Sequence, residues 1–315
     1  MTCLVIGGGG FIGQWLTRHL LDRGRSVVVL GRRSQRPEGL DARASYRAGD
    51  YGDRVLIDSA LDEVDEVVDL AYSTVPKSSF EDPVYDISTN LPQCVGLMQA
   101  AAARRHIRRL VLVSSGGTVY GHAESTPLRE DHATNPVSPY GITKLAIEKY
   151  ALMFHRLQAL PVVIARPANA YGEGQLPYRG QGFIATAGAS MREGRPLTVF
   201  GGAQVVRDYV HVEDVVSGIT AVLDAGRTGA CYNIGSGVGH STQAVLSMLS
   251  ALAQAAGVTP IVEHRPARPF DVLVNVLDST RLQADTGWQP RVALDAGVVR
   301  TWRWLSDLGS LHGQA

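Results

Sequence analysis

Tyr140 and Lys144 are the residues whose types and spacing point most directly to chemistry. They lie four residues apart in SPYGITKLAIEKYALMF, a segment with apolar residues at helical spacing, so both side chains should share one face of a helix. An ammonium group near a phenol favours the phenolate and should lower the pKa of the tyrosine. Tyr140 is therefore predicted to act as an acid or base towards a sugar or alcohol hydroxyl.

A nucleotide site is expected at the N-terminus. TCLVIGGGGFIGQWLTRHLLDRG is typical of a strand, a glycine turn and a helix. Gly7, Gly10 and Gly13 are three residues apart, which suits a tight turn, close approach of a pyrophosphate and close packing of helix on strand. The phosphates would then meet the free N–H groups of the helix N-terminus.

The end of the second strand, SVVVLGRR, bears on the choice of cofactor. An acidic residue there would bind the ribose 2′-hydroxyl and favour NAD, but this chain has Gly31 followed by Arg32 and Arg33. Guanidinium groups suit a 2′-phosphate, so NADP is favoured over NAD. The alternative is that both arginines belong to a solvated loop.

Strands and helices continue to alternate along the chain. SYRAGDYGD, EVVDLAYS and RLVLVSS supply further strands, with a helix around TNLPQCVGLMQAAAARR. This rhythm predicts an α/β fold with a Rossmann-type doubly wound parallel sheet, in which ligands bind beyond the carboxyl ends of the strands. Asp50 and Tyr51 should then reach the adenine, and Ala71 and Tyr72 the middle of the cofactor.

The chain resembles the extended short-chain dehydrogenases that act on nucleotide sugars, and is most similar to the UDP-glucose 4-epimerase type. GGGGFIG, SSGGTVYG, SPYGITK, ARPANAYGEGQ, VVRDYVHVEDV and YNIGSG occur in the family's order, over nearly the whole length. The resemblance implies epimerisation through a transient 4-keto sugar. Tyr140 would serve as base and then acid, and Lys144 would hold the nicotinamide ribose. It also implies a homodimer formed through the Tyr140 helix.

The family pattern assigns further residues. The expected cofactor-binding set is Gly7, Gly10, Phe11, Ile12, Gly13, Arg32, Arg33, Asp50, Tyr51, Leu70, Ala71, Tyr72, Asn90, Tyr140 and Lys144. The expected substrate-binding set is Asn169, Gln181, Phe183, Arg207, Arg268 and Asp271, with Arg207 and Arg268 on the phosphates and Asp271 on a ribose. Asp208 and Asp214 should fix local structure, and His211 should be a core or hinge residue.

One position departs from the family. The usual Ser or Thr that hydrogen-bonds the reacting oxygen falls on Gly116. If the stretch stays extended, Ser114, Gly116 and Thr118 share a face, so Thr118 is expected to supply the catalytic hydroxyl. Ser115 is the alternative if the strand bends. Gly117 and Thr118 also stand where 4,6-dehydratases carry Asp-Glu, which argues against that reaction.

The predicted division is a dinucleotide-binding domain over residues 1–165 and a smaller C-terminal α/β substrate domain over 166–315. Segments around 200–230 should return to the first domain. The closing TGWQPRVALDAGVVRTWRWL is expected to form a return strand and a final amphipathic helix.

Composition excludes several other classes. Thirty Lys and Arg balance thirty Asp and Glu, so no net field attracts nucleic acid or an anionic membrane. Cys3, Cys94 and Cys231 are scattered and predict reduced core residues, and the histidines lack metal-ligand spacing. Without a cationic leader or a long apolar run, we expect a cytoplasmic protein with no membrane span.

Three functions remain open from the sequence. The leading hypothesis is a nucleotide-sugar 4-epimerase, with a UDP-hexose or its N-acetyl form as substrate. The second is an NADPH-dependent reductase of a nucleotide 4-keto-sugar, which Gly31, Arg32 and Arg33 favour. The third is a non-catalytic dinucleotide-binding regulator.

Overall fold

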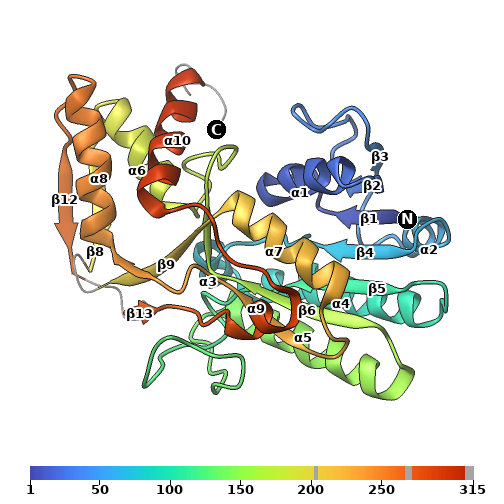
Figure 1. Cartoon of the computed structure of the whole chain (residues 1–315). Helices are drawn as coiled ribbons and strands as arrows, with labels where there is room; N and C mark the ends of the chain where they lie inside the picture. The colour runs from blue at the N-terminus through green and yellow to red at the C-terminus, as the bar shows by residue number, and fades with distance from the viewer. Residues whose placement is uncertain (202–204, 267–271, 309–315) are drawn as a thin grey trace.

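A seven-stranded parallel sheet forms the larger lobe of the computed structural model, which describes residues 1–201, 205–266 and 272–308 (Figure 1). The prediction of a doubly wound α/β fold is confirmed. The strand order is β10-β6-β5-β4-β1-β2-β3. The strands are β1 (Thr2–Ile6), β2 (Ser26–Gly31), β3 (Ser45–Ala48), β4 (Glu66–Asp69), β5 (Arg109–Val113), β6 (Val162–Pro167) and β10 (Cys231–Ile234).

Helices cover both faces of this sheet, which is why its central strands are apolar on both sides. One apolar core contains Leu16, Val215 and Leu282 of α1 (Phe11–Asp22), α7 (Val212–Ala225) and α9 (Thr280–Thr286). The core on the other face contains Ile57, Leu97 and Ile147 of α2 (Arg54–Leu61), α4 (Pro83–Ala102) and α5 (Pro139–Gln158). The short α3 (Pro76–Glu81) precedes α4. Strand order reverses between β1 and β4, and ligands of such sheets bind beyond this switch point.

The smaller lobe is built from two small sheets and three helices. Strands β7 (Asn169–Tyr171), β9 (Val206–His211), β11 (Gly239–Ser241) and β13 (Val274–Asn275) form one sheet, and β8 (Leu197–Phe200) pairs with β12 (Val262–Arg265). Its core includes Ile184, Leu249 and Trp302, from α6 (Phe183–Arg192), α8 (Thr242–Ala255) and α10 (Leu294–Asp307). Figure 1 shows these three helices grouped together, away from the large sheet.

The chain crosses between the lobes several times. After β9 it returns to the larger lobe as α7 and β10, and β10 forms the edge of the large sheet beside β6. It then crosses back for β11, α8 and β12, and α9 again packs against α7 and β10. The returning segments therefore reach beyond residue 230 and include residues 280–286.

The return strand expected after residue 286 is absent, and that prediction was wrong. Residues 287–293 have no regular structure. The carboxylate of Asp214 accepts the backbone N–H groups of Arg291 and Val292, both at 2.9 Å. A side chain on α7 thus takes the place of a neighbouring strand. Among the described helices, none is both long and apolar enough to cross a membrane.

Candidate functional site

A cleft of about 400 Å³ opens at the carboxyl ends of β1, β2, β3 and β4. Ten of the residues predicted to bind the cofactor line it: Gly7, Gly10, Arg32, Arg33, Asp50, Tyr51, Leu70, Ala71, Tyr72 and Asn90. Phe11, Ile12 and Gly13 lie in the first turn of α1, next to the lining residue Gly10. Tyr140 and Lys144 are not part of its lining; they lie on α5.

The start of α1 is shaped to bring backbone close to a ligand. A Cβ at Gly13 would lie 2.5 Å from the carbonyl oxygen of Gly7 and 2.5 Å from the Cα of Gly8. Only glycine allows the helix to approach the β1 turn this closely, so the N-terminus of α1 faces the cleft. The cleft, this close approach and the free N–H groups together fit a dinucleotide with its pyrophosphate at the helix end.

Tyr46 also lines the cleft, although it is not among the residues predicted from the sequence. Its hydroxyl lies 2.6 Å from the carbonyl oxygen of Arg33 and 3.2 Å from that of Gly31. A Cβ at Gly31 would lie 3.0 Å from this hydroxyl. Tyr46 therefore leaves little room beside position 31 for the acidic side chain typical of NAD sites. Nothing in the local sequence pattern marks it, because the contact joins β3 to β2.

Helix α5 carries Tyr140 in its first turn. The Oγ of Ser138 accepts the N–H of Gly141 at 3.1 Å and so caps the helix. The N–H of Tyr140 donates to the Oγ of Ser79 on α3 at 3.1 Å. Lys144 is 6% exposed, and its Nζ donates to the carbonyl oxygen of Val113 at the end of β5, at 2.9 Å. The helix thus fixes both side chains at the carboxyl edge of the sheet.

The ring of Tyr72 lies close to both residues. Its centroid is 4.7 Å from that of Tyr140, in an edge-to-face arrangement with an interplanar angle of 66°. The Nζ of Lys144 lies 4.1 Å from the Tyr72 centroid and 5.9 Å from the Tyr140 centroid. The lysine therefore contacts Tyr72 more closely than it contacts Tyr140.

The electrostatics of Tyr140 differ from the expectation. Burial, and next the negative charge of Asp86, raise the pKa of the Tyr140 phenol, while the Ser115 hydroxyl lowers it in part. Lys144 is not among the groups that lower the pKa of Tyr140, and the shift is opposite in direction to the one expected. Burial lowers the pKa of Lys144. The acidic groups around it, Cys94, Asp69, Glu148 and Asp86, raise the pKa but do not cancel this effect.

The glycine stretch turns instead of staying extended. The N–H groups of Thr118 and Val119 both donate to the carbonyl oxygen of Ser115, at 3.3 and 3.2 Å. The extended geometry on which the choice of Thr118 depended is therefore wrong. The Ser115 hydroxyl is the one that acts on Tyr140, whose pKa it lowers in part, whereas the Thr118 Oγ1 is buried and has no partner among the described residues.

Position 116 faces the core. A Cβ at Gly116 would lie 2.4 Å from a methyl group of Leu277 and 2.9 Å from the carbonyl oxygen of Arg166. In addition, the Nδ2 of Asn275 donates to the carbonyl oxygen of Gly116 at 3.1 Å. In this turn a side chain at position 116 would meet Leu277, so position 115 presents the hydroxyl.

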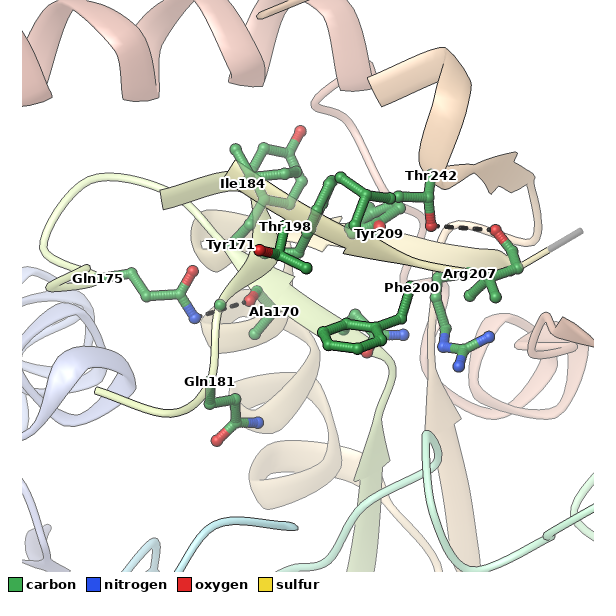
Figure 2. Close-up of a pocket in the computed structure, with 15 residues that line it drawn as sticks. Ala170, Tyr171, Gln175, Gln181, Ile184, Thr198, Phe200, Arg207, Tyr209 and Thr242 are labelled. Carbon is green, nitrogen blue, oxygen red and sulfur yellow. Dashed lines mark hydrogen bonds between the residues drawn. The ribbon is translucent and has the colours of Figure 1, made fainter. Parts of the chain in front are cut away.

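A second cavity, of about 220 Å³, lies in the smaller lobe and contains four predicted substrate residues, Asn169, Gln181, Phe183 and Arg207 (Figure 2). Other residues that line the cavity carry no mark in the local sequence, among them Thr198, Phe200, Tyr209 and Thr242. Hydrogen bonds from Gln175 to the Ala170 carbonyl and from Thr242 to the Val205 carbonyl hold its walls, at 3.1 and 3.3 Å. Arg268 and Asp271 lie outside the described residues.

The structure also places Asp208, His211 and the three cysteines. The carboxylate of Asp208 accepts the N–H groups of Ser236, Gly237 and Leu277. His211 is fully buried and lies 2.9 Å from Glu173. The three cysteines are free. In the described part of the chain, no group of three His, Cys, Asp or Glu side chains could hold a metal.

Comparison with known proteins identifies the family. Residues 3–235 match the model of the NAD-dependent epimerase/dehydratase family. The chain belongs to this family. It is 34% identical over 308 residues to a UDP-glucose 4-epimerase of Mycolicibacterium smegmatis, covering 96% of this chain and 97% of that protein. It is also 30% identical to a dTDP-glucose 4,6-dehydratase of Streptomyces niveus, with 98% and 93% covered.

A solved structure agrees over the whole fold. The UDP-glucose 4-epimerase of Thermotoga maritima, solved with UDP-glucose, has a TM-score of 0.91 and 29% identity, and the match covers 98% of this chain and 99% of that one. Within the epimerase/dehydratase family the chain is an enzyme of the extended short-chain dehydrogenase class, of the UDP-glucose 4-epimerase type. The alternative of a non-catalytic regulator is therefore set aside.

Proposed function

We propose that this enzyme is a nucleotide-sugar 4-epimerase acting on a UDP-hexose. The observation that carries the proposal is the Tyr140–Ser115 pair at the carboxyl end of β5, next to the dinucleotide cleft through Tyr72. The cavity of the smaller lobe, lined by four of the residues predicted to bind the substrate, and the relatives named as UDP-glucose 4-epimerases support it.

The proposed roles follow from the geometry. When bound, a nicotinamide dinucleotide supplies reversible hydride transfer. Tyr140 takes the proton of the sugar 4-hydroxyl and later returns it, and Ser115 hydrogen-bonds the same oxygen. Lys144, fixed by the Val113 carbonyl, holds a positive charge in the water-poor interior beside the ring of Tyr72. Ser115 replaces Thr118 in this account because of the turn.

The smaller lobe is proposed to bind the nucleotide. Arg207 would meet the phosphates, and Asn169, whose side-chain amide donates to the Asp208 carbonyl at 3.1 Å, would hold the substrate against β9. A 4,6-dehydratase reaction is disfavoured because Gly117 and Thr118 bring no carboxyl group to the turn. A Cβ at Gly117 would meet no atom nearer than 3.7 Å, so this side of the turn is open towards Asn169 and Ser115.

The choice of dinucleotide is a separate proposal. The family is NAD-dependent, but Arg32 and Arg33 line the cleft and Tyr46 crowds position 31, which together favour a 2′-phosphate and hence NADP. The same observation favours the second candidate function, an NADPH-dependent reductase of a nucleotide 4-keto-sugar.

One experiment separates the two functions. The purified protein is incubated with UDP-glucose or UDP-galactose without added cofactor, and the dinucleotide released on denaturation is identified. Interconversion of the two sugars, abolished in Tyr140→Phe, supports the epimerase. No interconversion, together with an empty site that binds NADPH and reduces a 4-keto sugar, overturns it in favour of the reductase. Release of NAD would contradict the preference for NADP.

The enzyme is further proposed to be a homodimer. Helices α4 and α5 pack side by side and expose large apolar side chains to solvent: Val84, Tyr85 and Ile87 on α4, and Ile142, Tyr150, Met153 and Leu157 on α5. A second copy of the same helix pair would bury these side chains in a four-helix interface.

A further inference from the structure

Asp86 on α4 is a fully buried carboxylate that the proposed chemistry does not use. Its two oxygens accept hydroxyl groups from neighbouring elements. Thr74 donates to Oδ1, and Thr143 donates to Oδ2 at 2.6 Å. The hydroxyl of Tyr72 lies 3.4 Å from the same Oδ2. We call Thr74, Asp86, Thr143 and Tyr72 the Asp86 cluster.

The Asp86 cluster contacts the active site at two points. Thr143 directly precedes Lys144 on α5, one turn after Tyr140, so its hydrogen bond ties the catalytic turn of the helix to α4. Tyr72 places its ring edge-to-face with Tyr140 and beneath the Nζ of Lys144. Both tethers end on one carboxylate. A buried charge is costly unless it is hydrogen-bonded, and the hydroxyl groups of the Asp86 cluster supply these bonds.

The charges around Asp86 come from few groups. On α5 the nearby cation is Lys144. Its pKa is also raised by the charges of Asp69 and Glu148. From the loop after β4 the titratable neighbour is Tyr72, and from α5 it is Tyr140. Lys77 and Glu81 of α3 and Asp82 at the start of α4 are exposed to solvent. No described Arg or Lys forms an ion pair with Asp86 within 4.0 Å, and the hydroxyl groups of Thr74 and Thr143 donate hydrogen bonds to its carboxylate.

We propose that Asp86 is a positioning residue of the active site, whose carboxylate fixes Tyr140 and Lys144 through Thr143 and Tyr72 and keeps a negative charge behind them. The inference rests on the proposed role of Tyr140. The charge favours the protonated phenol, in agreement with the raised pKa of Tyr140. The carboxylate thereby favours Tyr140 as a proton donor.

The test is a titration of Tyr140 that needs no sugar substrate. Phenolate absorbance is followed against pH in the NADP-loaded protein, and the signal of the Tyr140→Phe protein is subtracted. In Asp86→Asn the apparent pKa of Tyr140 is expected to fall by about one unit, because a like charge has been removed. Asp82→Asn, an equal charge change at an exposed site on the same helix, is expected to leave it in place.

Thr143→Val provides a second variant that keeps the charge. It removes a hydroxyl that offsets the carboxylate, so the apparent pKa of Tyr140 is expected to rise. An unchanged pKa in Asp86→Asn overturns the proposal, as does a fall in Thr143→Val. If Asp86→Asn does not fold, Thr143→Val alone decides. Because the readout is absorbance, a wild-type protein that titrates as expected but fails to epimerise would count against the proposed function alone.

Discussion

At the scale of single residues, Ser115 and Thr118 supply the two hydroxyl groups of the turn, and their surroundings differ. The Ser115 hydroxyl lowers the pKa of Tyr140 in part, whereas Thr118 Oγ1 is buried away from any described partner. We expect Ser115→Ala to lower kcat by roughly 10²–10³, by analogy with loss of one oxyanion donor. Thr118→Val should stay within a few-fold of the wild type. Steady-state kinetics with UDP-galactose checks both, and equal losses would contradict the assignment.

Gly116 offers a second prediction at this scale. Placing a serine at the position where the family pattern has its hydroxyl should not rescue Ser115→Ala, because a Cβ there meets Leu277 at 2.4 Å. Gly116→Ser is expected to lower the free energy of unfolding by about 1–3 kcal/mol through overpacking. Gly117→Ser, whose Cβ meets nothing nearer than 3.7 Å, is the matched control and should cost much less in urea unfolding. Rescue of turnover by Gly116→Ser would mean that the turn rearranges.

At the scale of elements, helix α5 is tied to the sheet by a buried ion pair. Arg166 on β6 donates to both oxygens of Glu148 at 2.9 and 2.6 Å, and the two side chains are 5% and 2% exposed. Glu148→Gln is expected to lower the free energy of unfolding by about 3–5 kcal/mol, because it leaves a buried guanidinium unpaired. Urea unfolding measures this loss. Lys149→Gln, one residue along and exposed, should change it by less than about 0.5 kcal/mol.

A double variant distinguishes pairing from packing at the same place. Replacing both Glu148 and Arg166 by Met should recover much of the stability, since a buried pair is often no better than apolar side chains of similar volume. A double variant as unstable as Glu148→Gln would show that the other bond of Arg166, to the Tyr120 hydroxyl at 2.9 Å, dominates.

The elements that the sequence predicts best are those with local patterns. The β1–α1 glycine cradle and the start of α5 depend on residues a few positions apart, and both are found as expected. The turn at Ser115 depends on Asn275 and Leu277, more than 150 residues away, and no local pattern encodes it. Likewise, Asp86 and Tyr46 act through neighbours on other elements. The strand predicted after residue 286 was wrong for the same reason, because the carboxylate of Asp214 on α7 accepts the N–H groups of Arg291 and Val292.

At the scale of the whole molecule, Glu173 joins three parts of the chain. Its carbonyl oxygen accepts the indole N–H of Trp15 on α1, and its carboxylate meets His211 of β9 and Arg300 of α10, each at 2.9 Å. The N–H of Glu213 donates to Nδ1 of His211, so Nε2 carries the proton and donates to Glu173. Burial opposes ionisation, yet the bonds from His211 and Arg300 lower the pKa of Glu173 from 4.5 to about 2.

These contacts of Glu173 predict part of the loss of protein stability in acid. A carboxyl group with a lowered pKa in the folded state stabilises it above the unfolded value, and this contribution is lost as the pH falls from about 4.5 through about 2. Glu173→Gln should therefore be less stable than the wild type at pH 7, with a difference that shrinks as the pH approaches 2. Urea unfolding at several pH values checks this. A difference in stability that does not change with pH would show that Glu173 stabilises the fold through packing and not through its charge.

Dimerisation through α4 and α5 can be tested at the exposed apolar side chains of these helices. Leu157 on α5 is 75% exposed and Met153 is 37% exposed, and α4 adds Val84 at 73%, so the helix pair presents large apolar side chains to solvent. If a second copy covers it, Leu157→Glu places two buried carboxylates in each symmetric interface, where they cannot be solvated. Sedimentation should then show the wild type at twice 33.8 kDa and the variant at 33.8 kDa. Val238→Glu, an equal change at a 53% exposed site in the loop between β10 and β11, should remain dimeric. A wild type that sediments as a monomer would leave this face without its proposed occupant.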